Sequence, residues 1–261
     1  MWIDTHCHLD AAEFSADRDA VAAAARQAGV DSIVVPSVAV ANFIAVRDCC
    51  QRYPGCRPAY GIHPMYTPQA HEHDLGVLRA WLERERSVAV GEIGLDHYVT
   101  GLDPVRQAFF FAEQLKLARE FDLPVLLHVR RAIDLILKEL RRYRVRGGIA
   151  HAFNGSKQQA DAFIDLGFKL GFGGAMTWKR ATRLRALARE LPHEAIVLET
   201  DAPDIPPQFA PCKQPGERVR NEPALLPQIA ETLSELWEIP LPAVAKITSQ
   251  NAIFILGNIT E

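Results

Sequence analysis

Short apolar runs alternate with longer segments of helical spacing along the whole chain, and this alternation limits the possible folds more than any other feature. The strand-like runs cover residues 2–8, 31–38, 57–62, 87–93, 124–129, 147–152, 168–172 and 195–200. Between them, stretches such as 103–121 repeat apolar residues at helical intervals. About eight strand–helix units in 261 residues predict an α/β fold, a single (β/α)8 TIM-type barrel domain spanning residues 1–261.

An open, doubly wound parallel sheet is the alternative fold. Such a sheet usually has fewer strands and carries a glycine-rich phosphate-binding turn. The sequence contains neither a Gly-x-Gly-x-x-Gly nor a Walker motif, so we favour the barrel. In a barrel the functional site lies at the carboxyl ends of the strands. Residues 202–223, which are rich in proline, are expected to form an ordered loop beside that face.

Composition limits the partners and the compartment. The formal net charge is −3, so the chain as a whole does not attract the negatively charged backbone of nucleic acid. Nucleic-acid binding would require a local basic cleft. The five cysteines, an odd number that includes the adjacent pair Cys49 and Cys50, favour a reducing compartment. Neither a signal-like start nor a membrane-length apolar run is present. We expect a cytoplasmic protein with no membrane segment and no obligate protein partner.

Residues that can bind a metal recur near the carboxyl ends of these runs. They are His6, His8, Glu92, His128, His151 and Asp201. Alternate strand residues share a face, so His6 and His8 are expected to point the same way. Glu92 and Asp201 would be costly in apolar strands without partners. Imidazole and carboxylate ligands without cysteine suit Zn²⁺, Mn²⁺ or Mg²⁺, and six of them are enough for two divalent ions. The pattern predicts a metal-dependent hydrolase.

Each of these residues also has a structural interpretation. A single strand histidine is often a hydrogen-bonded core residue, and a carboxylate at a strand end often caps a helix. Cys7, between the two histidines, is expected to pack in the core. A non-catalytic barrel, with a structural metal or a partner-binding surface, is the alternative at the level of function. The joint pattern favours the hydrolase.

The same residues fall into ordered motifs along nearly the whole chain. These are Asp4-Thr5-His6-Cys7-His8, Gly61-Ile62-His63-Pro64, Gly91-Glu92-Ile93-Gly94-Leu95-Asp96, His128-x-Arg130-x-Ala132, His151-x-Phe153-x-Gly155, Glu199-Thr200-Asp201-x-Pro203 and Asn221-Glu222-Pro223. Together they resemble the TatD family of metal-dependent hydrolases, within the amidohydrolase-type barrels. The resemblance implies that His6, His8, Glu92 and Asp201 bind one metal, and that Glu92, His128 and His151 bind a second. It also implies Mg²⁺- or Mn²⁺-supported nuclease activity, including 3′→5′ exonuclease action on single-stranded DNA.

Three departures from the family pattern concern the substrate pocket. Met65 follows His63-Pro64 where a second histidine is common, and His97 stands where an aromatic residue is commoner. The 203–219 loop also differs from the usual pattern. None of these residues belongs to the implied ligand set, so the departures concern the substrate rather than the chemistry.

We expect hydrolysis of a phosphodiester, with Asp201 and Glu92 as the residues that carry it. Asp201 would accept a proton from metal-activated water, and Glu92 would bridge the ions. His63 and Arg130 are the expected phosphate contacts, with a structural role or a salt bridge as their respective alternatives. The ligand set alone does not separate this reaction from hydrolysis of an amide, a lactone or a small phosphoester. Asp96 and Glu199 are expected to orient ligands, and Lys179, Arg180, Arg183 and Arg185 to form an ordinary helix surface.

Overall fold

Eight parallel strands form the centre of the computed structural model, which describes residues 1–212, 219–257 and 259. They are β1 (Trp2–Asp4), β2 (Val30–Pro36), β3 (Cys56–Ala59), β4 (Val90–Asp96), β5 (Val125–Arg130), β6 (Gly148–Ala150), β7 (Phe168–Phe172) and β8 (Ile196–Leu198). Hydrogen bonds join them into two parallel sheets, β1 to β3 and β4 to β8. The predicted barrel is thus confirmed, and no doubly wound sheet forms.

Two seams close the sheets into a barrel. Between β3 and β4, Gly91 donates its N–H to the carbonyl of Tyr60 at 3.0 Å. Between β8 and β1, the backbone N–H and the hydroxyl of Thr5 both donate to the carbonyl of Leu198, at 3.1 and 3.0 Å. The second seam joins residues 193 positions apart in the sequence. The barrel is therefore closed by contacts between the two ends of the strand series.

Several strands end earlier than the apolar runs predicted. β1 ends at Asp4 and β6 at Ala150, so the expectation that His6, His8 and His151 lie within strands is wrong. β4 differs in the other direction, since it starts at Val90 and continues to Asp96. The histidines that follow β1 and β6 therefore project from the loops at the carboxyl rim, where loop contacts rather than strand alternation direct them.

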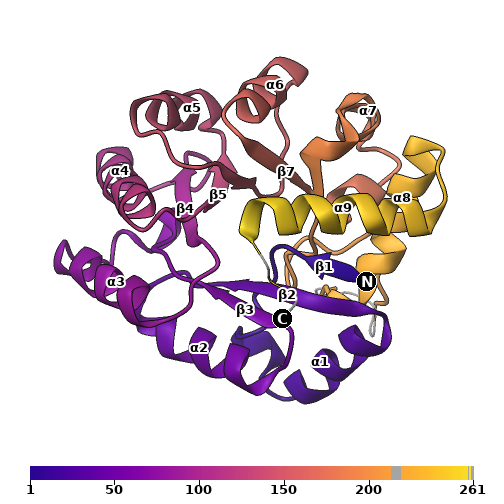
Figure 1. Ribbon diagram of the computed structural model, residues 1–261, viewed down its shortest axis with the longest axis horizontal. Helices are drawn as coiled ribbons and strands as arrows, with labels where there is room; N and C mark the ends of the chain where they lie inside the picture. The colour runs from indigo at the N-terminus through magenta and orange to yellow at the C-terminus, as the bar shows by residue number, and fades with distance from the viewer. Residues whose placement is uncertain (213–218, 258, 260–261) are drawn as a thin grey trace.

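Helices α1 to α8 lie around the strands (Figure 1). They are α1 (Arg18–Gln27), α2 (Phe43–Arg52), α3 (His73–Arg84), α4 (Pro104–Glu120), α5 (Ile133–Arg142), α6 (Lys157–Asp165), α7 (Thr182–Glu190) and α8 (Leu226–Trp237). The predicted helix within 103–121 is α4, which Asp103 caps by accepting the N–H groups of Val105 and Arg106. It buries Phe111 and Leu115 against the sheet.

The last helix, α9 (Leu241–Leu256), crosses one end of the barrel instead of joining the ring (Figure 1). Its Ala252, Ile255 and Leu256 pack on side chains that come from around the barrel, namely Ile3, Val34, Ala59, Ala89, Leu126, Ile149 and Val197. Because these strand residues precede the carboxyl rim, α9 forms an apolar floor at the amino end. Among the described residues, no single helix is long and apolar enough to cross a membrane.

Candidate metal centre

Backbone contacts between the segments after β1 and β8 bring His6, His8 and Asp201 together. Asp201 has a left-handed φ of 58° and donates its N–H to the carbonyl of His6 at 2.8 Å. As a result, the Asp201 Oδ1 atom lies 3.7 Å from His6 Nε2 and 3.8 Å from His8 Nε2. The two Nε2 atoms are 3.4 Å apart, so the expected convergence of the two histidines is confirmed.

A buried aspartate holds this junction in place. Asp4 is fully buried, and its carboxyl group accepts the backbone N–H of Thr200 at 2.9 Å and the Thr200 hydroxyl at 2.6 Å. The same group lies 3.3 Å from the N–H of His6. Asp4 thus locks the His6 segment to the Asp201 segment. It had no assigned role in the sequence, although it opens the first quoted motif.

Glu92 lies at the centre of the cluster, and its two carboxylate oxygens face different imidazoles. Oε2 is 3.1 Å from His6 Nε2 and 3.6 Å from His8 Nε2. Oε1 faces three other ring nitrogens, His128 Nδ1 at 3.0 Å, His63 Nε2 at 3.4 Å and His151 Nε2 at 3.7 Å. The side chain of Glu92 is only 2% exposed. Such a carboxylate is placed to serve two neighbouring sites at once.

Two outer carboxylates fix the orientation of two of these imidazoles. Asp96 Oδ2 lies 2.9 Å from Nε2 of His128, and Glu199 Oε1 lies 3.1 Å from Nδ1 of His151. A carboxylate in this position accepts a hydrogen bond from the ring N–H, so that the other ring nitrogen can offer its lone pair when a metal replaces the second proton. That other nitrogen, Nδ1 of His128 and Nε2 of His151, faces Glu92 in both rings. The expectation that Asp96 and Glu199 orient ligand side chains agrees with this geometry.

His63 has the opposite arrangement. Its Nδ1 accepts the backbone N–H of Met65 at 3.1 Å, so the neutral ring carries its proton on Nε2, which faces the cluster. Burial lowers the pKa of His63, against the opposing effect of Glu92. A protonated Nε2 donates hydrogen bonds and offers no lone pair to a metal. His63 therefore suits an anion contact better than metal binding, although it lies in the same cluster.

The charge states of His6 and Glu92 suit cation binding. Burial, together with the neighbouring His151, lowers the pKa of His6 to about 4. Burial favours the neutral form of Glu92, but His63, His6 and His128 outweigh it and hold the pKa of Glu92 well below its ordinary value. At neutral pH the pair is a neutral imidazole and a carboxylate, which are the forms that bind metals.

Asp201 and His151 have raised pKa values. Burial raises the pKa of Asp201 to about 6, although His151 and His8 oppose the rise. Burial also disfavours the charged form of His151, but Asp201 and Glu199 outweigh it and raise the pKa of His151 to about 10. The carboxylates thus stabilise positive charge within the cluster. A proton on His151 provides such charge, and a bound divalent cation would provide it instead.

Three groups within the cluster have ligand atoms close enough to converge on a cation. They are His6, Glu92 and His151; His6, His8 and Asp201; and His63, Glu92 and His128, with all atoms of a group within 4.8 Å of one another. All six predicted ligand residues therefore come together. The donor set and the two carboxylate-oriented imidazoles fit divalent metal ions.

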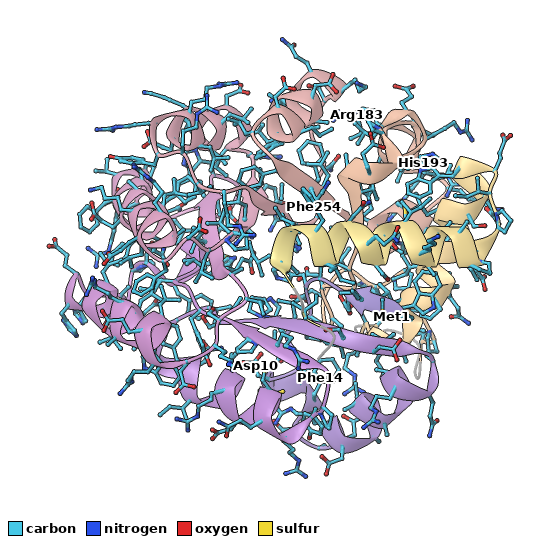
Figure 2. All side chains as sticks on the ribbon, in the orientation of Figure 1. Met1, Asp10, Phe14, Arg183, His193 and Phe254 are labelled. Carbon is cyan, nitrogen blue, oxygen red and sulfur yellow. The ribbon has the colours of Figure 1, made fainter. Side chains whose placement is uncertain are left out.

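Other candidates lie apart from the cluster. Arg130 is exposed, and its guanidinium group stacks on the Tyr98 ring at 3.9 Å from the ring centre. Arg183 lies on α7 at the outside of the molecule, as expected of a helix surface (Figure 2). Met65 is 40% exposed and His97 is partly buried. Part of the 203–219 loop, residues 213–218, lies outside the described residues.

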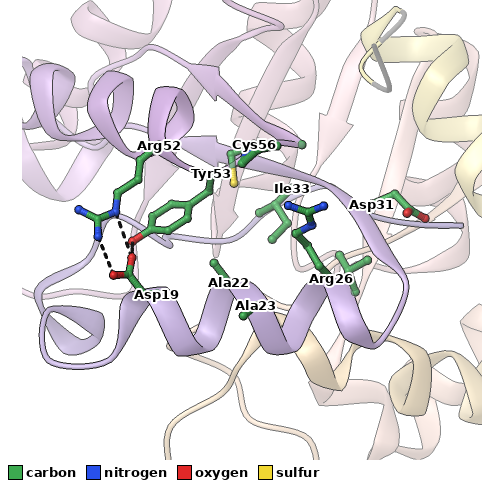
Figure 3. A pocket seen from close by; sticks show the side chains of 12 residues that line it. Asp19, Ala22, Ala23, Arg26, Asp31, Ile33, Arg52, Tyr53 and Cys56 are labelled. Carbon is green, nitrogen blue, oxygen red and sulfur yellow. Dashed lines mark hydrogen bonds and ion pairs between the residues drawn. The ribbon is translucent and has the colours of Figure 1, made fainter.

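A separate cavity of about 250 Å³ lies on the outer wall, between α1 and the end of α2 (Figure 3). Asp19 on its rim accepts hydrogen bonds from Arg52 and Tyr53. None of the cluster residues lines this cavity. The metal centre and this cavity are therefore independent features.

Comparisons with known proteins agree with this site. A family model described as TatD related DNase matches residues 3–257. The chain is 40% identical over 255 residues to the uncharacterized metal-dependent hydrolase YjjV of Escherichia coli (strain K12), which covers 96% of this chain and 95% of that protein. It is 34% identical over 257 residues to the 3′-5′ ssDNA/RNA exonuclease TatD of Edwardsiella piscicida, with 96% and 97% covered.

Solved structures extend the likeness to three dimensions. The crystal structure of YjjV from Escherichia coli has a TM-score of 0.90 to this chain at 38% identity and covers 97% of both chains. A dihydropyrimidinase from Brevibacillus agri NCHU1002 shares the fold at a TM-score of 0.67 and 13% identity, over 98% of this chain and 70% of that one. The family match and the relatives show that the chain belongs to the TatD family of metal-dependent hydrolases.

Proposed function

We propose that the protein is a phosphodiesterase that shortens single-stranded nucleic acid from the 3′ end with two divalent cations. The observation that carries the proposal is the position of Glu92, whose two oxygens face two different groups of imidazoles. The similarity to the Edwardsiella exonuclease supports the bond type, the substrate and the direction. The identity of the cations, Mg²⁺, Mn²⁺ or Zn²⁺, is left to the experiment below.

The residues divide between two neighbouring cation sites. His6, His8 and Asp201 converge as one group and would hold one cation with Glu92. His128 and His151 both face Glu92 Oε1, at 3.0 and 3.7 Å, and would hold the other with the same carboxylate. Bound there, a cation pair supplies Lewis acidity, which lowers the pKa of water and stabilises charge on phosphoryl oxygens. Asp96 and Glu199 keep the two imidazoles of the second site in the ligand tautomer.

Asp201 is the proton acceptor in this proposal. Its side chain is 13% exposed, so one carboxylate reaches both the cluster and the opening of the barrel. Its left-handed backbone conformation and its hydrogen bond to the His6 carbonyl hold it there. A carboxylate so placed accepts a proton from the attacking water and returns it to the leaving oxygen. The Nε2–H of His63 and the guanidinium group of Arg130 would contact the phosphate.

The test is cleavage of single-stranded DNA labelled at its 5′ end by protein reconstituted separately with Mg²⁺, Mn²⁺ and Zn²⁺. We expect stepwise shortening that disappears in Asp201→Asn and His128→Ala. Asn has nearly the size and shape of Asp but cannot accept the proton of the attacking water. Asp201→Asn should therefore lose activity and keep a near-native melting temperature. His193→Ala is a suitable control, because His193 stacks on Trp237 at 3.9 Å and takes no part in the cluster.

Two results would count against the proposal. Near-native turnover by Asp201→Asn would remove Asp201 from the role of proton acceptor. Absence of cleavage by wild-type protein with two bound cations per chain would reject the nuclease and direct the search to amides, lactones and small phosphoesters. Internal cuts instead of stepwise shortening would reject cleavage from the 3′ end but retain the phosphodiesterase activity.

A further inference from the structure

An exposed tyrosine at the carboxyl rim lies against two guanidinium groups. Tyr98, in the loop after β4, is 47% exposed. The Cζ atom of Arg130 lies 3.9 Å from the centre of its ring, and the Cζ atom of Arg131 lies 4.6 Å from it. Both arginines are exposed and follow one another at the end of β5. Aromatic surface and positive charge are thus concentrated at one point of the rim.

The positive charge of this group is not neutralised by any of the described residues. Neither Arg130 nor Arg131 forms an ion pair or a side-chain hydrogen bond with any residue that the structure describes. Arg131 also has a left-handed φ of 54°, a conformation that non-glycine residues seldom adopt. Two like charges held together in this way attract an anion, and the fork of a guanidinium group fits a phosphate with two hydrogen bonds.

Asp96 connects this group to the metal centre. Its Oδ1 atom accepts the N–H groups of Tyr98 and Val99 at 2.8 and 2.9 Å, while its Oδ2 atom lies 2.9 Å from His128 Nε2. Asp96 is also the register partner of Arg130 in the β4–β5 pair. A single buried residue therefore fixes both the imidazole of His128 and the backbone of Tyr98, so the loop that carries the tyrosine begins beside the cluster.

We propose that Tyr98, Arg130 and Arg131 form a subsite for the nucleotide next to the scissile phosphodiester. Bases stack on aromatic rings and on guanidinium planes alike, and the free N–H groups of the arginines bind the adjoining phosphate. The inference rests on the proposed function, since it assigns part of the same substrate to the rim beside β4 and β5. It adds Tyr98 and Arg131 to the substrate contacts.

A second aromatic–guanidinium pair lies elsewhere on the carboxyl face. Arg180 lies 4.7 Å from the ring centre of Trp178, after β7. Trp178, however, is partly buried and donates its Nε1–H to the Pro206 carbonyl at 3.2 Å, which ties it to the proline-rich loop. No hydrogen bond among the described residues joins it to the cluster in the way that Asp96 joins Tyr98. The geometry thus favours the rim at Tyr98.

The experiment measures the affinity of metal-loaded protein for a labelled phosphorothioate deoxythymidine decamer and for an abasic decamer of the same backbone. Tyr98→Ala removes the ring, and Arg131→Asn removes one charge with a residue that tolerates the left-handed conformation. Two substitutions serve as matched controls. Phe254→Ala removes an exposed aromatic ring of α9 that lies beside the amine of Lys169 (Figure 2), and Arg142→Ala removes a guanidinium group that lies over the ring of Tyr143 at the end of α5.

We expect Tyr98→Ala to raise the Kd for the thymidine decamer about 10-fold and to leave the abasic decamer nearly unaffected, because only stacking is lost. Arg131→Asn should weaken both decamers and reduce the salt slope of binding by about 0.7, as for one lost contact to a single strand. Both controls should bind like wild type. If Tyr98→Ala and Arg131→Asn also bind like wild type, or if wild type does not bind the decamer, the subsite is rejected.

The two proposals fail in different ways. Wild-type protein that cleaves DNA while Tyr98→Ala and Arg131→Asn bind it normally would reject the subsite and retain the function. Wild-type protein that binds the decamer through Tyr98 and Arg131 but hydrolyses no phosphodiester would support the subsite and reject the function.

Discussion

Gly171 in β7 provides the space in which the Glu199 carboxylate lies. A Cβ atom added at Gly171 would be 2.1 Å from Glu199 Oε2, 2.6 Å from its Cδ and 2.9 Å from Oε1. Glu199 is 1% exposed, so its carboxylate has little room to turn elsewhere. In Gly171→Ala the carboxylate must move away from its present partners, which are His151 Nδ1 at 3.1 Å and the N–H of Ala152 at 2.6 Å.

The cost of this change has two parts. Forcing an extra methyl group into a packed site costs about 1–3 kcal/mol in the free energy of unfolding. For a chain of this size, each kcal/mol lowers Tm by roughly 2–4 °C, so the packing cost alone should lower Tm by about 2–12 °C, and the lost hydrogen bonds add to this decrease. Loss of the carboxylate behind a metal-binding histidine weakens metal affinity by about 10- to 100-fold.

The assay combines thermal unfolding of the metal-free protein with calorimetric titration of Mn²⁺. Gly76→Ala is the matched control, because a Cβ atom at Gly76 in α3 would meet no atom within 4 Å. A Gly171→Ala protein with lowered Tm but unchanged Mn²⁺ affinity would refute the idea that Glu199 supports the metal through His151. Unchanged values of both quantities would refute the packing argument itself.

Four further predictions concern stability and activity. Gly76→Ala should raise the free energy of unfolding by about 0.5–1 kcal/mol in urea denaturation, since alanine favours the interior of α3. Leu126→Ala should lower it by about 2–5 kcal/mol in the same experiment, because it opens a cavity between the barrel interior and α9. Removal of metal with a chelator should lower Tm, because ligand at 100 times its Kd contributes about 2.7 kcal/mol; an unchanged Tm would argue against a bound metal. Asp201→Asn should abolish turnover in the cleavage assay with little change in Tm, and retained turnover would contradict its role.

Much of the fold was predictable from hydrophobic periodicity. The alternation of strand and helix predicts the barrel because each parallel strand requires a crossover helix. Strand ends were less predictable: the predicted strand 2–8 ends at Asp4 as β1, although residues 5–7 remain buried beyond it. The position of α9 was also not predictable, because helical spacing reports an apolar face but not the surface that it covers.

The cluster of candidate ligands was predictable because imidazoles and carboxylates stand out at the ends of apolar runs. The reason given for His6 and His8 was nevertheless wrong, since both lie beyond the strand. They meet because the segment around Asp201 pairs with theirs, a contact between distant parts of the sequence. The space at Gly171 and the stack on Tyr98 depend likewise on residues from neighbouring strands, and single-sequence patterns do not report such contacts.

The seam between β8 and β1 has a consequence for the newly made chain. Its partners Thr5 and Leu198 are separated by 193 positions, so at roughly 5–20 residues per second the ribosome adds the second about 10–40 s after the first. Until Leu198 has been added, the edge of β1 that does not face β2 has no partner strand, and such an open edge is a template for aggregation. We expect nascent chains to need protection until α9 has been synthesised and the barrel can close.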